Sequence, residues 1–278
     1  MINVTIHLRD EENFTNVRSR AIGRGLQELN GVRVKYMSRG ERDTKSNLVI
    51  QTGFNASVPL RDALDRQCPY IIMEEPHWRP DKDFCVSVAS WGYNGLGGRG
   101  WHPPVPDTAR PKPALHARKT DGVTIIFAQK PNDHSLCGAD HIAWIKRKLA
   151  LYPDAELRHH PLMCAVEQEP LDEALDRCYR AVTFSSTVGG EALIAGCISL
   201  PDDEGSMAYT AHSRAKWLHE LSWKQFSHTE YHRPDVASWI MSGYEEARAS
   251  ARKGNVQTPR NKVDRNIECL RYYREFGN

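Results

Sequence analysis

Short runs rich in β-branched residues alternate with longer segments of helical periodicity along the first part of the chain. Strands are predicted at five such runs, residues 2–8, 32–37, 47–51, 70–74 and 84–90. A helix is predicted from about Asn13 to Leu29, where apolar residues recur at helical spacing, and another at residues 59–68. Strand, helix and strand in succession predict a parallel sheet covered by helices on both faces.

Residues 92–122 are rich in glycine and proline and show no apolar periodicity, which predicts a loop followed by a linker. Beyond this segment the alternation starts again. Strands are predicted at 123–128, around 155–160, at 181–184 and at 197–200, and helices at about 138–151, 171–179, 189–195 and 209–221. The closing segments, 236–252 and 262–276, also have helical spacing.

The pattern therefore predicts two α/β domains joined by a linker, with a boundary near residue 118. Residues 1–118 form the first domain, residues 119–250 the second, and residues 251–278 a basic C-terminal helix that packs back on the first domain. Ligands of such folds bind in crevices at the carboxyl ends of parallel strands, so a cleft between the two domains is the expected ligand site.

The composition is that of a soluble globular protein, with 40% hydrophobic and 26% charged residues. No apolar run reaches the about 18 residues of a membrane span, and the start of the chain lacks the layout of a signal peptide. We therefore expect a cytoplasmic protein without a membrane partner. Its seven cysteines include no CxxC pair, which favours reduced thiols over disulfides or a structural zinc site.

Positive charge is distributed unevenly, although the formal net charge is only +2. Between Arg18 and Lys45 there are eight basic and three acidic residues, and between Arg248 and Arg274 eight basic and two acidic. Such segments either follow a nucleic-acid backbone or form solvated helix faces, and charge alone does not separate the two.

The segment "RAVTFSSTVGGEALIAGC", residues 180–197, has a strand, loop and helix pattern. Ser185, Ser186 and Thr187 fall on the turn, where hydroxyls and the free amides of a helix start form an anion site. Gly189 lets a phosphate approach the backbone, and Glu191 in the first helical turn accepts hydrogen bonds from a ribose. The alternative is a capped helix, with Ser or Thr as the cap and Glu191 completing a capping box.

Two further loops of the second domain carry polar side chains. Arg158 and His160 in "ELRHHP" follow a strand, where they neutralise a diphosphate; alternatively, a histidine there binds a metal or caps a helix. Gln129 in "FAQKPNDHSL" follows another strand and belongs either to an ordinary turn or to the floor of a cleft.

In the first domain, "MEEPHWRPD" ends a predicted strand with two carboxylates, Glu74 and Glu75. A carboxylate at a strand end that faces a cleft is a candidate general base. The alternative is that both pair with nearby arginines.

Taken together, these segments resemble GT-B-type glycosyltransferases of bacteriophage DNA-modification systems and, more distantly, capsule-polysaccharide transferases. The resemblance covers roughly residues 48 to 230 and depends on the order and spacing of short segments. They are "TGFNASVPLRDAL", "YIIMEEPHW", "SWGYNGLGGRG", "FAQKPNDHSLCG", "ELRHHP", "SSTVGGEALIAG", "DDEGSMAY" and "RAKWLHELSWKQFSHTE". The chain departs from the family at Ala128, where a glycine is usual, and at His159, which stands at the middle position of the Arg-x-His-Pro pattern.

The resemblance implies a GT-B-like fold, with two Rossmann-like domains facing across a cleft, and a nucleotide-sugar, most simply a UDP-sugar, on the second domain. The donor residues it implies are Gln129, Arg158, His160, Ser185, Ser186, Thr187, Gly189 and Glu191. On the acceptor side it implies Asn55, Trp78, Asn94 and Arg99, with Glu75 or Glu74 as the catalytic base. No cofactor and no metal are expected, because cationic side chains neutralise the diphosphate and no Asp-x-Asp motif is evident.

The expected acceptor is the hydroxymethyl group of a modified pyrimidine in phage DNA, 5-hydroxymethylcytosine first. Such an enzyme flips the base or approaches it through the major groove, and Trp78, Trp91 or Trp101 are candidates to stack on it. Two alternatives stay open. One is a sugar transferase that acts on a polysaccharide or a glycolipid, and the other is a nucleotide- or nucleic-acid-binding module without turnover.

Overall fold

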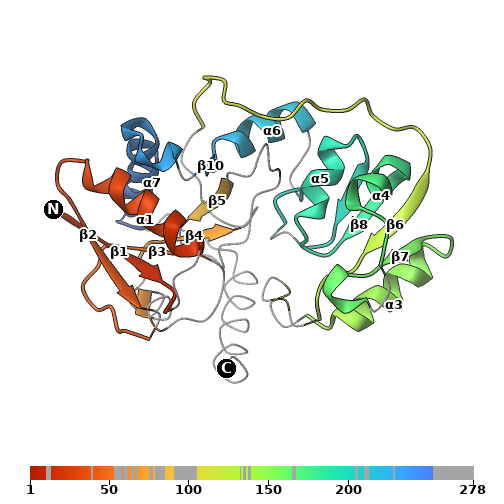
Figure 1. Ribbon diagram of the computed structural model, residues 1–278, viewed down its shortest axis with the longest axis horizontal. Coiled ribbons are helices and arrows are strands. Elements are labelled where there is room, and N and C mark those ends of the chain that lie inside the picture. Colours follow the sequence, from red (N-terminus) through yellow and green to blue (C-terminus); the bar gives the residue numbers. More distant parts are fainter. Residues whose placement is uncertain are drawn as a thin grey trace. The chain divides into compact units, whose positions relative to one another are not determined.

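The computed structural model divides into two compact units (Figure 1). The first comprises Met1–Gly95, Gly100–Arg110 and Leu221–Asn278, and the second Leu96–Arg99 and Pro111–Glu220. The structure describes residues 1–10, 14–38, 40–52, 58, 62–63, 66, 68–74, 78, 85–90, 105–131, 133, 136, 139–164, 167–203, 206–209, 213–227 and 229–252. Among the helices of these residues, none combines the length and the apolar character that crossing a membrane requires.

The first unit is built on a mixed sheet in the order β10-β5-β4-β3-β1-β2. Its strands are β1 (Ile2–Leu8), β2 (Val32–Ser38), β3 (Leu48–Thr52), β4 (Tyr70–Glu74), β5 (Cys85–Ser90) and β10 (Gln225–Ser227). β1 pairs in parallel with β2 and β3, and β3 with β4, whereas β5 is antiparallel to both β4 and β10.

The antiparallel edge corrects the expectation of a fully parallel sheet. Only residues 75–84 separate β4 from β5, and a parallel crossover needs about a dozen residues or more. The connection is therefore too short to carry the chain back to the end of the sheet at which β4 begins. β5 runs antiparallel beside β4 instead.

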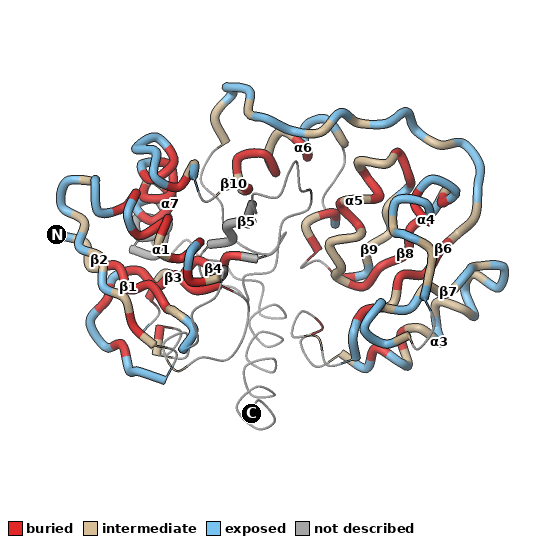
Figure 2. Tube along the Cα trace, in the orientation of Figure 1, coloured by how far each residue is buried: buried red, intermediate tan, exposed pale blue. Residues whose placement is uncertain are grey.

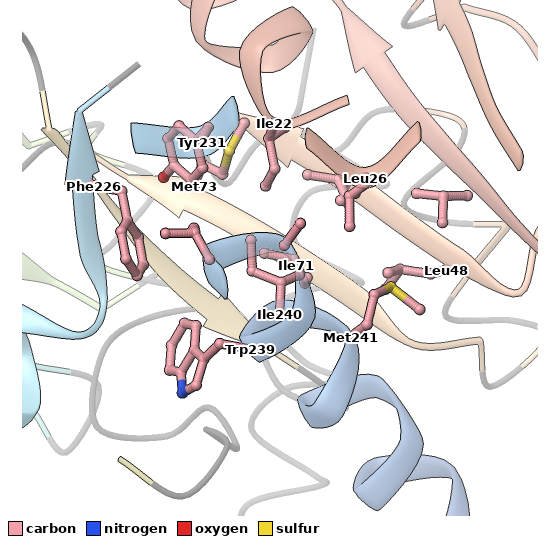
Figure 3. Close-up of a cluster of buried hydrophobic side chains, with 14 of the residues drawn as sticks. Ile22, Leu26, Leu48, Ile71, Met73, Phe226, Tyr231, Trp239, Ile240 and Met241 are labelled. Atoms are coloured by element: carbon pink, nitrogen blue, oxygen red, sulfur yellow. The ribbon is translucent and has the colours of Figure 1, made fainter. Parts of the chain in front are cut away.

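Two helices, α1 (Phe14–Gln27) and α7 (Pro234–Arg252), contribute to the core on one face of this sheet. Figure 3 shows Ile22 and Leu26 of α1 with Ile240 and Met241 of α7 around the buried strand residue Ile71. On β1 and β2 the alternate residues Val4, Ile6, Val32, Val34 and Tyr36 belong to this cluster or pack against it. The opposite face of these two strands therefore carries their odd-numbered residues.

The first unit also contains a late part of the chain, which differs from the predicted domain boundaries near residues 118 and 250. β10, the short helix η4 (Glu230–His232) and α7 all belong to it. The reason is apolar burial: Phe226, Tyr231 and Trp239 are between 0% and 7% exposed in the same cluster as Ile71. The part of the predicted C-terminal helix beyond residue 252 lies outside the described residues.

The second unit is built on a wholly parallel sheet in the order β7-β6-β8-β9. Its strands are β6 (Val123–Phe127), β7 (Glu156–Arg158), β8 (Cys178–Thr183) and β9 (Ile198–Pro201). Its helices are α3 (His141–Leu151), η3 (Pro161–Met163), α4 (Leu171–Arg177) and α5 (Val188–Ile194), and the chain passes back to the first unit within α6 (Arg214–Ser222).

Helices cover both faces of the second sheet, and Figure 2 shows buried positions along its strands. Ile125 and Phe127 of β6 pack with residues of α4 and α5, whereas the intervening Ile126 packs with Trp144 of α3. This alternation places consecutive side chains of one strand in two separate cores. The predicted mixed α/β class is confirmed, while the GT-B arrangement of the two domains stays a prediction.

Candidate functional site

The strand order of the second unit defines where a ligand site is expected. β6 pairs with β7 on one side and with β8 on the other, so the chain leaves β6 in one direction and later returns in the opposite direction. Such a reversal is the topological switch point at which open parallel sheets bind ligands, beyond the carboxyl ends of the strands. The loops that follow β6 and β8 meet at this point.

Hydrogen bonds join these two loops directly. Gln129, two residues beyond β6, is 6% exposed, and its Oε1 accepts the backbone N–H of Ser185 at 2.9 Å. Its Nε2 donates to the Ser185 hydroxyl at 3.3 Å. The predicted donor residues Gln129 and Ser185 are therefore brought together, and the glutamine amide fixes the turn after β8.

His141 completes this connection, and sequence reasoning did not single it out. The histidine is the first residue of α3, and its Nε2 accepts the backbone N–H of Gln129 at 2.8 Å. Its ring is 3% exposed and stacks on Trp144 at 5.0 Å between centroids. Because Nε2 acts as an acceptor, the imidazole is neutral, with its hydrogen on Nδ1.

Burial lowers the pKa of His141, although the nearby carboxylates of Asp133 and Asp140 act in the opposite direction. The folded unit therefore holds this imidazole in the neutral form in which it receives the Gln129 amide.

We expect the second unit to lose stability as the pH falls below 6.5, the ordinary histidine pKa. The unfolded chain then binds a proton at His141 that the folded unit does not, a slope of up to about 1.4 kcal/mol per pH unit. The slope vanishes below the lowered folded pKa. Denaturant unfolding from about pH 7.5 to pH 5 checks this, and His141→Gln should flatten the dependence; an unchanged slope in the variant contradicts the assignment.

The turn after β8 takes a form that excludes a capping box. The Ser186 hydroxyl accepts the Val188 N–H at 3.3 Å, while the side chain of Thr187, the residue before α5, makes no capping bond. A capping box needs a Ser or Thr three residues before the glutamate, and Val188 stands at that position before Glu191. The hydroxyl of Thr187 is therefore not used in capping α5.

Gly189 is explained by close packing of α5 on the strands. A Cβ atom there would lie 3.2 Å from the Ser199 hydroxyl oxygen and 3.3 Å from that of Thr183. Both hydroxyl oxygens are buried and have no hydrogen-bond partner among the described residues. The predicted approach of a phosphate to this glycine remains a prediction.

Arg158 is the last residue of β7 and His160 follows it at the same edge of the sheet, and each has a protein partner. Arg158 Nη2 donates to the Glu169 backbone oxygen at 2.6 Å, and Nη1 lies 3.8 Å from the Glu169 carboxylate. His160 Nδ1 accepts the Leu162 N–H at 3.2 Å, so this histidine caps η3. A ligand at these side chains would have to compete with those partners.

Glu191 is half-buried in the first turn of α5, at the carboxyl end of β8. On the acceptor side, Trp78 is half-buried and Glu74 is the last residue of β4, where it pairs in register with Ser87. The other predicted residues, Glu75, Asn55, Asn94 and Arg99, and the candidate tryptophans Trp91 and Trp101, lie outside the described residues. The acceptor-side assignment therefore stays a prediction.

No group of three or more His, Cys, Asp or Glu side chains in the described ranges is placed to hold a metal ion. Four cysteines within these ranges are free thiols, and Cys68, Cys178 and Cys197 are buried.

No protein-family model and no curated protein matches the chain. Among solved structures, the chain is similar to the Thermosulfurimonas dismutans KpsC beta Kdo 2,4 transferase, with 16% identity, TM-score 0.43, and coverage of 78% of this chain and 89% of the other. The beta Kdo 2,7 transferase of the same protein matches with 12% identity, TM-score 0.43, and coverage of 85% and 99%. An NAD-bound 3-phosphoglycerate dehydrogenase of Entamoeba histolytica matches with 10% identity, TM-score 0.23, and coverage of 92% and 97%. None of the three is described as a DNA-modifying enzyme, so the predicted link to phage enzymes rests on the sequence segments.

Proposed function

We propose that the protein is a glycosyltransferase whose second unit binds the diphosphate and ribose of a nucleotide-sugar. The observation that carries the proposal is the pair of loops at the switch point of the second sheet, joined by the hydrogen bonds between Gln129 and Ser185. These bonds hold the turn in place before any ligand arrives, and pre-organised donors lose little entropy when a ligand binds.

The polar groups at this edge match the chemistry of a diphosphate. The turn offers the hydroxyl of Thr187, which makes no capping bond. Arg158 ends β7, the strand on the other side of β6, and His160 follows it. Arginine and neutral or protonated histidine both donate to phosphate oxygens. Glu191, one turn into α5, supplies a carboxylate acceptor for ribose hydroxyls.

The proposed reaction is displacement at the anomeric carbon of the sugar. The acceptor hydroxyl oxygen forms the new bond to that carbon, the bond from the carbon to the diphosphate oxygen breaks, and the diphosphate leaves with the electron pair. Glu75 or Glu74 takes the hydroxyl proton, and Arg158 and His160 stabilise the departing charge. Direct attack inverts the anomeric carbon, whereas a front-face retaining route needs no base.

The proposed acceptor is a hydroxymethylated pyrimidine in DNA, 5-hydroxymethylcytosine first, and the donor is a UDP-sugar. A polysaccharide or glycolipid acceptor is the alternative within the same reaction class. The proposed donor site is the same for the DNA acceptor and for the polysaccharide or glycolipid acceptor, because both reactions use a nucleotide-sugar.

One assay separates these possibilities. The protein is incubated with a set of nucleotide-sugars and with DNA that contains 5-hydroxymethylcytosine, 5-hydroxymethyluracil or neither, and the digested nucleosides are weighed by mass spectrometry. A hexose or pentose added only to modified DNA supports the DNA acceptor. Transfer to glycans alone replaces that acceptor, and nucleotide binding without transfer or hydrolysis contradicts the enzyme.

Glu191→Ala is expected to weaken nucleotide-sugar binding by about tenfold or more, because hydrogen bonds to a charged group contribute about 1.5–3 kcal/mol. Titration calorimetry with the donor measures the effect, and binding of DNA should not change. Glu173→Ala is the matched control, since Glu173 is an exposed first-turn glutamate of the neighbouring helix α4. Equal affinities of the two variants would contradict the ribose contact.

The base is tested separately by Glu75→Gln and Glu74→Gln, which keep the shape of the side chain and remove its basicity. The variant at the true base should lose transfer by about 100-fold or more while it still binds the donor. Full transfer by Glu75→Gln would exclude that residue, and full transfer by both variants would favour the retaining route.

A further inference from the structure

The first unit contains a pocket of about 420 Å³ between β1, β2 and the segment that connects β2 to β3. This connection, of which residues 40–47 are described, leads from the end of β2 to β3 on the other side of β1. Pocket volumes of about 300–1,000 Å³ are typical of small-molecule sites. The pocket belongs to a different unit from the candidate donor site.

Four of the eleven residues that line the pocket are basic and one, Asp43, is acidic. Arg33 and Lys35 come from β2, where they alternate with Val32, Val34 and Tyr36, which pack against the core on the other face. The register sets Asn3 of β1 opposite Arg33 and Thr5 opposite Lys35. Arg42 and Lys45 come from the connecting segment.

The connecting segment is held in place by Asp43. The carboxylate of this residue, which is 5% exposed, accepts the Ser46 N–H at 3.2 Å and the Lys45 N–H at 3.3 Å. Its Oδ2 also lies 3.8 Å from Arg66 Nη2, and the Asp43 N–H donates to Asp62 at 3.1 Å. Although burial acts in the opposite direction, the hydrogen bonds lower the pKa of Asp43.

The acidic charge in the lining is thus compensated, whereas the basic charge is not. Within the described residues, Arg33, Lys35, Arg42 and Lys45 form no ion pair, in contrast with Arg66, whose guanidinium lies beside Asp43. Glu41, which precedes Arg42 in the sequence, does not line the pocket, and its carboxylate accepts the Ser38 N–H at 3.3 Å. Four cations around one concave surface concentrate positive potential there.

We propose that this pocket binds the phosphate groups of an anionic ligand about the size of a nucleotide. The lysine and arginine side chains of the lining supply charge-assisted donors, and Asn3 supplies a neutral polar group. A free phosphorylated metabolite and one nucleotide of a nucleic-acid strand share this chemistry. The site is independent of the transferase reaction, because it requires neither the sugar donor nor the residues of the second unit.

The test is a titration of the full chain with inorganic pyrophosphate, a nucleoside monophosphate, a short oligothymidylate and polygalacturonate, which is an anion without phosphate. The double variant Arg33→Gln/Lys35→Gln should weaken binding of the phosphate ligands by at least about tenfold. For the oligothymidylate, the slope of log K against log salt should fall in magnitude by about 1.4, since two phosphate contacts are lost.

The matched control is Lys146→Gln/Arg147→Gln, which removes the same two charges from exposed positions of α3 in the second unit. Thermal unfolding verifies that both double variants are folded. Loss in the pocket variant alone supports the site, and tight binding of pyrophosphate then identifies a metabolite, whereas binding of the oligothymidylate alone identifies a strand. Equal loss in both variants, no loss in either, or equally tight binding of polygalacturonate overturns the proposal.

Discussion

Replacing Arg110 with methionine is expected to destabilise the first unit by about 2 to 4 kcal/mol. The side chain of Arg110 is 7% exposed, and its Nη2 lies 2.7 Å from Glu230 Oε1. Its Nε donates to the Ser222 carbonyl at 2.8 Å, and its guanidinium carbon lies 4.3 Å from the centroid of the Phe226 ring. Methionine fills similar space but donates no hydrogen bond to the Glu230 carboxylate or to the Ser222 carbonyl.

The large effect follows from what Arg110 connects. Arg110 is the last residue of the first unit before the chain enters the second unit at Pro111, and the chain returns to the first unit at Leu221. A second bond, from Trp223 Nε1 to the Thr108 carbonyl at 3.0 Å, joins the same two segments. Loss of the arginine should therefore free β10 and η4 from the end of the linker.

Hydrogen exchange measured by mass spectrometry tests this prediction, because it reports the opening of each segment separately. Peptides from β10 and α7 should lose protection in Arg110→Met, and peptides from the second sheet should not. Arg233→Met is the matched control: its ion pair with Asp235 has side chains that are 55% and 52% exposed, and such pairs contribute about 0 to 1 kcal/mol. Similar effects of both variants would show that Arg110 is not a structural anchor.

Replacing Trp144 with alanine is expected to destabilise the second unit by about 3 to 5 kcal/mol, the usual cost of a cavity left by a large aromatic residue. Trp144 is 1% exposed and packs edge to face on Phe184, with centroids 5.9 Å apart. Its Nε1 donates to Asp202 Oδ2 at 2.6 Å, which ties α3 to the end of β9.

The same substitution should disturb the candidate donor site, since His141 loses the ring on which it stacks. Exchange protection should fall in α3, β6 and β8, and binding of a nucleotide-sugar should weaken along with it. The matched control is Ile142→Ala on the same helix, where the side chain is 51% exposed and little burial is lost. Retained protection in Trp144→Ala would contradict the assigned packing.

Periodicity alone placed most of the regular structure. The predicted strands at 2–8 and 70–74 have the same bounds as β1 and β4, and the predicted helix at 189–195 is displaced by one residue from α5. These elements succeed because their apolar pattern records which side of each element is buried. β10, a strand of three residues at the antiparallel edge of the first sheet, was missed.

The candidate site was predicted in part. Ser185, Ser186 and Gln129 were assigned to strand-end loops from the change of pattern after β6 and β8, and the parallel sheet brings those loops to one edge. The bond between Gln129 and Ser185 joins residues 56 positions apart, and no local pattern specifies it. His141 could have been noted only as a polar residue beside a helix cap, because its partner lies on the preceding loop.

The sequence by itself determined the α/β class, the positions of most helices and strands, and the set of polar residues at the strand ends, since all of these follow from local periodicity and turn chemistry. Only the tertiary structure decided that the chain returns to its first unit at β10 and α7, that β5 runs antiparallel, and that Arg33, Lys35, Arg42 and Lys45 surround one pocket. These features depend on which distant segments bury surface against one another. That choice is a property of the whole chain's packing, so no window of sequence contains it.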